Sequence, residues 1–342
     1  MITKYNFDVN SLILNLNKEY GIQIKNFEFI PMGDSAYSYR VNCKNGDLYY
    51  MKIFDHKNSR QRNGIERLNH YLPLTWELFH NRILKNITYP IKQRKGDFIT
   101  TFNDFTLVLF NFIEGETLAE AYPLSKEILK EIAKEMASIH RTTANLDTTP
   151  LLKETYDISF EADLLKCISV LESPLSSRNT IKQVLQEEVL KKKDQILLLL
   201  NRVRELREVA LKDTKDKVLC HGDIWGGNLI RHKKDLCLID WESAIIAPPE
   251  LDLFSYIGEE FDSFFRFYQE YMGQAIVINI ELLRFYSYRH QLRNLTNWLM
   301  NILYRNTDET QNQNDLEMIL HHCMNRWDTI EQNVLMSFQY EL

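Results

Sequence analysis

Two different spacings of apolar residues divide this chain into a strand-rich first third and a largely helical remainder. Residues 1–20 carry apolar positions at helical spacing, and residues 59–81 do so again, although Pro73 must break or begin a helix there. Between these segments, from about Phe27 to Phe54, the pattern changes to that of strands. The pattern therefore predicts a helix, a strand region and a second helix at the start of the chain.

The clearest local signal in the strand region is a hairpin. Residues 39–43 and 48–54 are strand-like runs separated by a short segment that contains Asn45-Gly46, a pair that favours a tight turn between antiparallel strands. Further strands are predicted at 87–91, 98–102 and 105–113.

After Gly115 helical spacing takes over. Ser125 is placed to cap a helix, and residues 180–210 form another amphipathic stretch. A strand, a loop and a hairpin interrupt this region at 218–240, and the chain is helical again from 251. We therefore expect an α+β protein with a small β-rich lobe at 1–113, a hinge at about 110–118, and a larger, mainly helical lobe at 119–342 that includes a helical insertion at about 151–212.

Composition narrows the class of protein. With 342 residues, 44% of them hydrophobic and 26% charged, the chain is long enough for two lobes and has the make-up of a soluble globular protein. The net charge of −6 argues against a nucleic-acid partner, and no apolar run is long enough for a membrane span or a signal peptide. The five cysteines are scattered, as in a reduced protein. We expect a cytoplasmic protein.

Two carboxylates follow short apolar strands in the 218–240 segment. Asp223 lies in the loop after the first strand, Asn228 follows five positions later, and Asp240 ends the hairpin. Transfer of a phosphoryl group needs Mg²⁺ held by oxygen ligands and a carboxylate that orients the attacking hydroxyl. Asp223 fits the orienting role, and Asn228 and Asp240 fit the metal-binding role. His221 is the second residue of the catalytic set, and we expect it to support the loop structurally and not to act as the base.

This order of residues resembles the catalytic loop and the metal-binding Asp of kinases. In detail, His221-Gly222-Asp223 and Ile239-Asp240-Trp241 are similar to the motifs of the aminoglycoside phosphotransferase and choline kinase superfamily, and with Glu242 and Asp252 they look closest to the spectinomycin-type antibiotic phosphotransferases. The resemblance covers about residues 20–310. It implies a bilobal protein-kinase-like fold that uses Mg²⁺ and ATP, with GTP as the alternative nucleotide.

The resemblance also implies a lysine that grips the nucleotide phosphates and pairs with a helical glutamate. Lys52, in the middle of a predicted strand, corresponds to that lysine. Glu66 is the preferred partner and Glu77 the rival, although either would also suit an exposed helix position.

Two further segments resemble nucleotide-binding parts of the family. Gly33 and Ser35 lie where a phosphate-covering loop is expected, although a segment with one glycine also suits an ordinary β-turn. Asn111, Phe112 and Ile113 resemble the hinge whose backbone binds adenine, and an ordinary strand end would leave the same sequence.

The helical insertion and the helices after residue 254 would form the substrate side. The candidate substrate-binding residues are Glu242, Glu259, Glu260, Asp262, Tyr286 and Arg289. Each is also explained by an ordinary surface or helix position.

We therefore expect an ATP-dependent O-phosphotransferase that acts on a small cationic hydroxyl compound, an aminoglycoside or aminocyclitol antibiotic, and that functions in antibiotic resistance as a monomer or homodimer. The alternatives are a metabolic kinase for choline, methylthioribose or homoserine, and a catalytically inactive nucleotide-binding module. A protein kinase is disfavoured because Gly222 replaces the arginine of His-Arg-Asp and Trp241 follows Asp240 where phenylalanine is expected.

Overall fold

The structure, a computed structural model, describes residues 5, 7–31, 35–174 and 180–338. The chain divides into two compact units, the first formed by Met1–Leu152 and Leu219–Ile246 and the second by Lys153–Val218 and Ala247–Leu342. The first unit therefore contains Lys52 together with Asp223 and Asp240, which the sequence placed in two different lobes.

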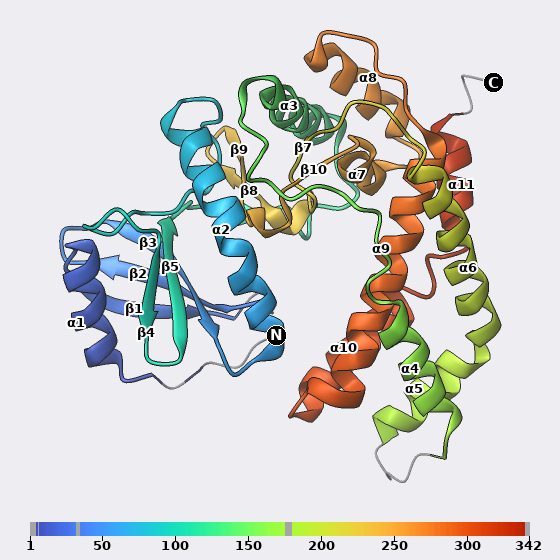
Figure 1. Ribbon diagram of the computed structural model, residues 1–342, viewed down its shortest axis with the longest axis horizontal. Helices are drawn as coiled ribbons and strands as arrows, with labels where there is room; N and C mark the ends of the chain where they lie inside the picture. Colours follow the sequence, from blue (N-terminus) through green and yellow to red (C-terminus); the bar gives the residue numbers. More distant parts are fainter. Residues whose placement is uncertain (1–4, 6, 32–34, 175–179, 339–342) are drawn as a thin grey trace. The chain divides into compact units, whose positions relative to one another are not determined.

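An antiparallel five-stranded sheet dominates the N-terminal part of the first unit (Figure 1). Its strands, in spatial order, are β1 (Ile24–Ile30), β2 (Tyr37–Cys43), β3 (Leu48–Asp55), β5 (Phe105–Asn111) and β4 (Ile99–Phe102). The predicted hairpin is confirmed as β2 and β3, with Gly46 at φ 91° in the turn. Residues 87–91 form only isolated bridges, from Ile87 to Leu238 and from Pro90 to Phe110, because a proline cannot donate to a continuous ladder.

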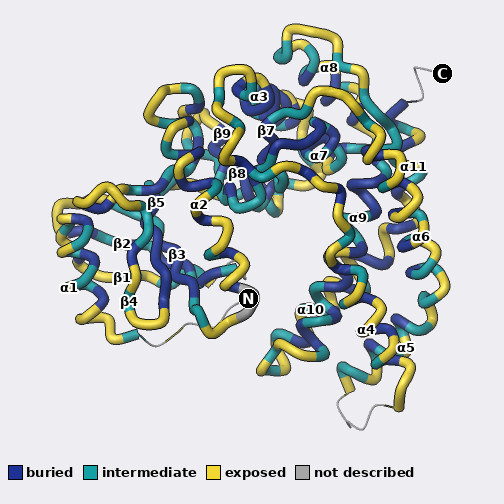
Figure 2. Tube along the Cα trace, in the orientation of Figure 1, coloured by how far each residue is buried: buried dark blue, intermediate teal, exposed yellow. Residues whose placement is uncertain are grey.

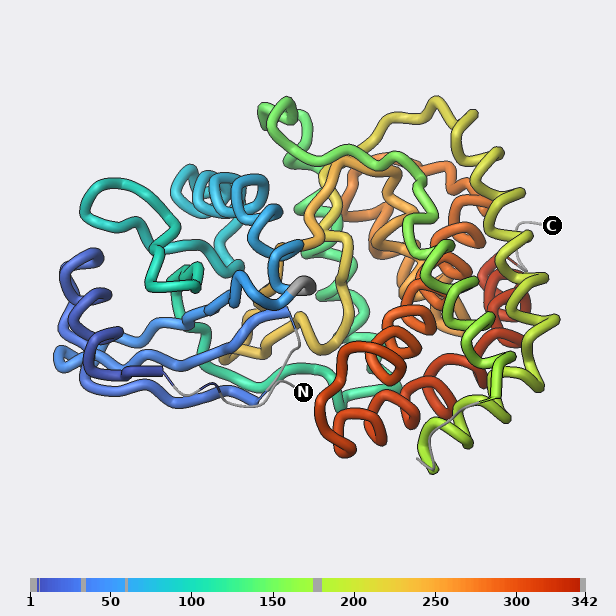
Figure 3. The backbone as a smooth tube through the Cα atoms, turned by 60° about the horizontal axis from the view of Figure 1, so that its bottom comes forward, coloured from blue at the N-terminus to red at the C-terminus, as the bar shows by residue number. Residues whose placement is uncertain are grey.

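The pleat of β3 decides where Lys52 points. Met51 and Ile53 are fully buried in a core that they share with Leu12 and Leu16 of α1 (Val9–Tyr20). Since side chains alternate across a strand, Lys52 faces the other side of the sheet. α2 (Ser59–His80) covers that side and packs so closely that a methyl group on its Gly64 would lie 2.9 Å from the Phe54 ring. The two helices thus cover opposite faces of the sheet (Figure 3).

Helix α2 is continuous through Pro73, although the sequence suggested a break or a start at that residue. Thr75 donates its hydroxyl hydrogen to the carbonyl oxygen of Tyr71 at 2.9 Å, next to the place where the proline withholds a backbone hydrogen bond. Burial of Leu68, Leu72 and neighbouring apolar side chains then outweighs the local cost of the proline.

The remainder of the first unit carries the predicted strand, loop and hairpin at 218–240. Its elements are α3 (Lys126–Thr142), β6 (Glu116–Thr117), β7 (Val218–Cys220), β8 (Leu229–His232), β9 (Asp235–Leu238) and β10 (Ile245–Ala247). β8 and β9 form the hairpin, β6 extends it, and β7 pairs with β10. Ser125 caps α3 as predicted, accepting a hydrogen bond from the backbone N–H of Ile128.

The second unit is helical. Its helices are α4 (Glu161–Glu172), α5 (Thr180–Lys191), α6 (Lys193–Ala210), α7 (Glu250–Leu253), α8 (Phe261–Met272), α9 (Ile280–Met300), α10 (Glu309–His322) and α11 (Thr329–Ser337). Helix α9 packs against α4, α6, α10 and α11, and its inward-facing residues are buried (Figure 2). The stretch at 180–210 is two helices rather than one, separated at Lys192, whose ammonium group binds the carbonyl oxygen of Met324 at 3.3 Å. Within the described ranges, no helix is both long and apolar enough to cross a membrane.

Candidate active site

The loop after β7 depends on a glycine that no other residue can replace without strain. Gly222 has φ +80°, and a Cβ at this position would lie 2.3 Å from the backbone oxygen of Ser243. The close approach brings the loop after β7 against the loop after β9. As a result, the segment that carries Asp223 and the segment that carries Asp240 are held together.

Asn228 orients the carboxylate of Asp223. It lies in a short 3₁₀ turn, Gly226–Asn228, and its amide nitrogen donates to Asp223 Oδ2 at 2.8 Å and to the Asp223 carbonyl oxygen at 2.9 Å. Because the amide nitrogen is committed to Asp223, the amide oxygen of Asn228 is the atom available for a cation.

His221 joins the two loops from inside the fold. Its ring is fully buried, contacts the backbone oxygen of Ile239 through Nε2 at 3.0 Å, and meets the Trp241 ring edge-on at 4.8 Å between centroids. These contacts support the bracing role.

Asp240 follows β9 in a strained backbone conformation, with φ 63° and ψ 65°. This conformation turns its carboxylate toward β3, where the Lys52 ammonium group lies 2.9 Å from Oδ1. Glu242, two residues later, forms a second and closer ion pair with the same ammonium group. The Lys52 side chain is only 8% exposed, whereas Asp240 remains 37% exposed.

The charges of Lys52, Asp240 and Glu242 shift one another's pKa values. Burial alone lowers the pKa of Lys52, but the carboxylates of Asp240 and Glu242 outweigh it and hold that pKa well above its usual value. Burial also raises the pKa of Asp240, but the attraction of Lys52 prevails and the pKa of Asp240 is lowered overall. Burial, reinforced by the charge of Asp240, raises the pKa of Glu242. Lys52 is thus a charged ammonium group beside an ionised Asp240.

The structure pairs Lys52 with the loop after β9 rather than with α2. Glu66 and Glu77 are both exposed on α2, and Glu77 accepts a long hydrogen bond from Asn81 at 3.5 Å. The sequence assigned Glu242 to the substrate side, so its pairing with Lys52 was missed. The signal was present in the Asp-x-Glu spacing, which puts two carboxylates on one short turn.

The other nucleotide-binding candidates lie near this cluster or at the end of β5. Ser35 donates to Glu242 Oε1 at 3.5 Å, and Gly33 lies outside the described residues. Asn111 ends β5 and accepts a hydrogen bond from the backbone N–H of Tyr89 at 2.7 Å. Phe112 and Ile113 follow beyond the sheet ladder and are partly buried.

The second unit uses two of the substrate-binding candidates for its own packing. Tyr286 is 1% exposed in the core around α9. Arg289 makes a two-point ion pair with the buried Glu154, at 2.7 and 3.1 Å. Apart from Glu242, the remaining candidates are Glu259, Glu260 and Asp262, which are exposed at the start of α8.

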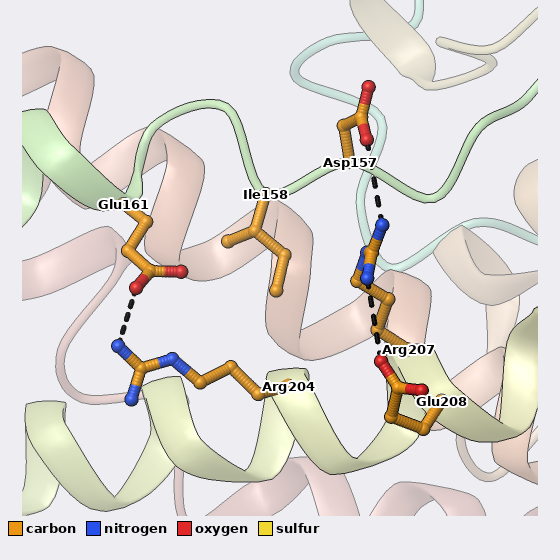
Figure 4. A pocket seen from close by; sticks show the side chains of 6 residues that line it. All are labelled: Asp157, Ile158, Glu161, Arg204, Arg207 and Glu208. Atoms are coloured by element: carbon orange, nitrogen blue, oxygen red, sulfur yellow. Dashed lines mark hydrogen bonds and ion pairs between the residues drawn. The ribbon is translucent and has the colours of Figure 1, made fainter.

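A separate cavity of about 250 Å³ lies in the second unit. It is lined by Asp157, Ile158, Glu161, Arg204, Arg207 and Glu208 (Figure 4). Arg204 pairs with Glu161, and Arg207 lies 3.4 Å from Glu208. Because the charged side chains that line this cavity pair with one another, it is a weaker candidate for a ligand site than the cluster around Lys52.

The donor set of the first unit suits a hard divalent cation. It consists of the oxygens of Asp240 and Asn228, with the Asp223 carboxylate beside them. Mg²⁺ prefers oxygen ligands of this kind. The residues present therefore fit a magnesium site next to a carboxylate that can orient a hydroxyl group.

Comparisons with known proteins place the chain among phosphotransferases. Residues 87–285 match the phosphotransferase enzyme family, APH. Protein StrN of Streptomyces griseus is 25% identical over 288 residues, which cover 81% of this chain and 79% of that protein.

Many solved structures resemble this chain, and two of them illustrate the shared fold. The spectinomycin phosphotransferase APH(9)-Ia, in complex with ADP and spectinomycin, superposes with a TM-score of 0.76 at 20% identity and covers 98% of this chain and 99% of its own. The amicoumacin kinase hAmiN, in complex with AMP-PNP, Ca²⁺ and Ami, does so with a TM-score of 0.59 at 15% identity and covers 92% and 93%. The expected kinase-like α+β fold is confirmed.

Proposed function

The chain belongs to the phosphotransferase enzyme family, and we propose that it transfers the γ-phosphoryl group of ATP to a hydroxyl group of an aminoglycoside or aminocyclitol antibiotic. The observation that carries the proposal is the convergence in one unit of Asp223, oriented by Asn228, with the ion pair of Lys52 and Asp240. The spectinomycin phosphotransferase, which is alike over nearly the whole chain, supports the aminocyclitol class.

Asp223 acts on the acceptor. Its carboxylate, held by the Asn228 amide, accepts the hydrogen bond of the substrate hydroxyl and turns the oxygen toward the γ-phosphorus. The bond from that oxygen to phosphorus forms while the bond to the β-phosphate oxygen breaks, the hydroxyl proton passes to Asp223, and ADP leaves. Because the transition state of such transfers is loose, orientation of the hydroxyl contributes before proton removal does.

Lys52 acts on the donor. Its ammonium group, kept charged by its carboxylate neighbours, binds the α- and β-phosphate oxygens. Mg²⁺, when bound, neutralises the charge that develops on the phosphates. Asn228 and Asp240 would hold it through oxygen atoms, and the exposed part of Asp240 is open to it.

The segment after β5 binds the adenine in this proposal. Phe112 and Ile113 lie beyond the last ladder position of β5, so their backbone groups are not used in the sheet. Such groups can form hydrogen bonds with a base edge. GTP is the alternative nucleotide, and a competition measurement between ATP and GTP separates the two.

The test is Mg²⁺-dependent ADP release from ATP across a panel of aminoglycosides, aminocyclitols, choline, homoserine and methylthioribose. Release should be stimulated by aminoglycosides or aminocyclitols. Asp223→Asn should lower kcat at least about 100-fold, since a positioned acid–base group contributes about 10²–10⁴-fold, while ATP binding persists in calorimetry.

Asp235→Asn is the matched control, because Asp235 is an exposed carboxylate on the β8–β9 hairpin of the same segment. It should retain wild-type turnover. Stimulation by choline, homoserine or methylthioribose alone would replace the antibiotic with a metabolic substrate. An Asp223→Asn enzyme that keeps a third of the wild-type kcat would remove Asp223 from the mechanism.

A further inference from the structure

The lysine of this site takes its carboxylate partners from a single turn. Asp240 and Glu242 both contact the Lys52 ammonium group, and both belong to the turn that follows β9. Helix α2, which covers the Lys52 side of the sheet, carries only Glu66 and Glu77 as acidic residues, and both are exposed.

Several contacts fix Glu242 in place. Its side chain is 14% exposed, and the preceding Trp241 is 1% exposed and packs on the His221 ring. Arg67 of α2 donates to the Glu242 backbone oxygen at 3.4 Å. Helix α2 thus holds the backbone of the turn, and the turn supplies the carboxylate.

Tyr71 is a buried residue of α2, the helix that covers the Lys52 side of the sheet. It is 3% exposed, and its hydroxyl group has no hydrogen-bond partner among the residues that the structure describes. Its pKa is raised well above the usual value, first by burial and next by the charge of Glu242, which places the hydroxyl within electrostatic reach of that carboxylate. Helix α2 therefore presents a buried phenol on this side of the sheet, while its two glutamates are exposed.

We propose that Glu242 is the positioning residue that holds Lys52 for phosphate binding, a role that rests on the proposed function. Lys52 carries one positive charge against two carboxylates. Asp240 is the more exposed of the two and the candidate metal ligand, so it would be shared with a bound cation. Glu242 would then be the partner that serves the buried ammonium group alone. Lys52 is thereby tied to the metal-binding turn and not to α2.

The test is a double-mutant cycle in kcat/KM for ATP. Glu242→Gln keeps the shape of the side chain and removes its charge, and it should lower kcat/KM at least tenfold. Lys52→Met should lower it further, and the double variant should match Lys52→Met within twofold, because a residue that acts only through Lys52 has nothing left to position. Glu66→Gln, the variant of the rival partner, should stay within twofold of wild type.

The same cycle in ADP affinity, measured in Mg²⁺ without an acceptor so that Asp240 is engaged by the cation, needs no turnover. Glu242→Gln should weaken ADP binding at least threefold with Lys52 present and leave it unchanged in the Lys52→Met background. The proposal is overturned if Glu242→Gln weakens ADP binding by the same factor in the Lys52→Met background as in wild type. It is also overturned if Glu66→Gln weakens ADP binding more than Glu242→Gln does. If the wild-type protein binds ADP but phosphorylates no acceptor, the proposed function is refuted and the role of Glu242 in nucleotide binding is not. If it binds no ADP, the proposed function and the role of Glu242 are both refuted.

Discussion

Replacing Gly222 with alanine should damage this protein far more than the same change five residues along the loop. The substitution adds one methyl group at a position with φ +80°, where that methyl meets the Ser243 backbone oxygen at 2.3 Å and the Ser243 carbonyl carbon at 3.1 Å. Both atoms belong to the backbone, so no side chain can turn aside to make room.

The magnitude follows from two effects. Left-handed backbone costs an L-residue about 1–2 kcal/mol. Displacing a packed neighbour costs about 1–3 kcal/mol more. The free energy of unfolding should therefore fall by about 2–5 kcal/mol, which is a fall in Tm of roughly 4–20 °C for a unit of this size. Activity should fall as well, because Ser243 follows Glu242 and its displacement moves the partner of Lys52.

Gly227→Ala is the matched control. The three atoms nearest to its methyl group would all be ring atoms of Trp225, the first at 2.2 Å, and Trp225 is 45% exposed. A side chain of that exposure can turn aside, and even an off-rotamer position costs only about 0.5–1.5 kcal/mol. Differential scanning fluorimetry compares the two variants directly. An equal fall in Tm for both variants would refute the claim that the close approach of Gly222 to Ser243 limits the stability of the protein.

Two further predictions concern the stability of the second unit. Burial, followed by the charges of Arg293 and Arg289, lowers the pKa of His290 from 6.5 to about 3. Between pH 7 and pH 5 His290 therefore takes up a proton in the unfolded chain but stays neutral in the folded chain. The free energy of unfolding should fall by about 2 kcal/mol over this range. Urea titrations should show this slope in wild type and not in His290→Gln, and equal slopes would contradict the assignment. Burial raises the pKa of Glu154, but Arg289 outweighs it, so the pKa is lowered overall and the stability that this pair contributes is present above pH 4.5 and lost as the pH falls below it. Glu154→Gln should cost about 3 kcal/mol at pH 7 because it leaves a buried guanidinium group without its carboxylate, and a loss below about 1 kcal/mol would refute the pair's importance.

The loop that carries Asp223 and Asn228 was the most predictable part of the candidate site because its contacts are local. Asn228 reaches Asp223 across five positions, through a single short turn whose geometry the intervening glycines permit. Spacing along the sequence carries such information directly. The hairpin of β2 and β3 was predictable for the same reason, since Gly46 allows its turn and the flanking strands follow.

The partner of Lys52 was not predictable in this way. Glu242 lies 190 positions from Lys52, and Glu66 and Glu77 lie much nearer in sequence. Only the packing of the loop after β9 against β3 and α2 decides which carboxylate is buried beside the ammonium group. Arg289 illustrates the same limit, because its partner Glu154 is 135 positions away and turns a candidate substrate contact into an internal ion pair.

Local continuity of the backbone was also decided by tertiary packing in two places. Pro73 was expected to break or begin a helix, but the buried face of α2 keeps the helix continuous around it. The strand-like run at 87–91 makes only isolated bridges, since Pro90 cannot supply the donor that a ladder requires.

By itself, the sequence determined the kind of protein: residue types at fixed short spacing indicated a phosphotransferase, and the family match confirms it. The α+β architecture followed as well, because apolar periodicity reports strands and helices wherever one face is buried. Tertiary structure alone decided which carboxylate holds Lys52 and which polar residues of the second unit are already paired. The physical reason is that the pairing of a buried charge depends on its desolvation and on the close approach of segments that are distant in sequence. The spacing of residues along the chain reports neither of these.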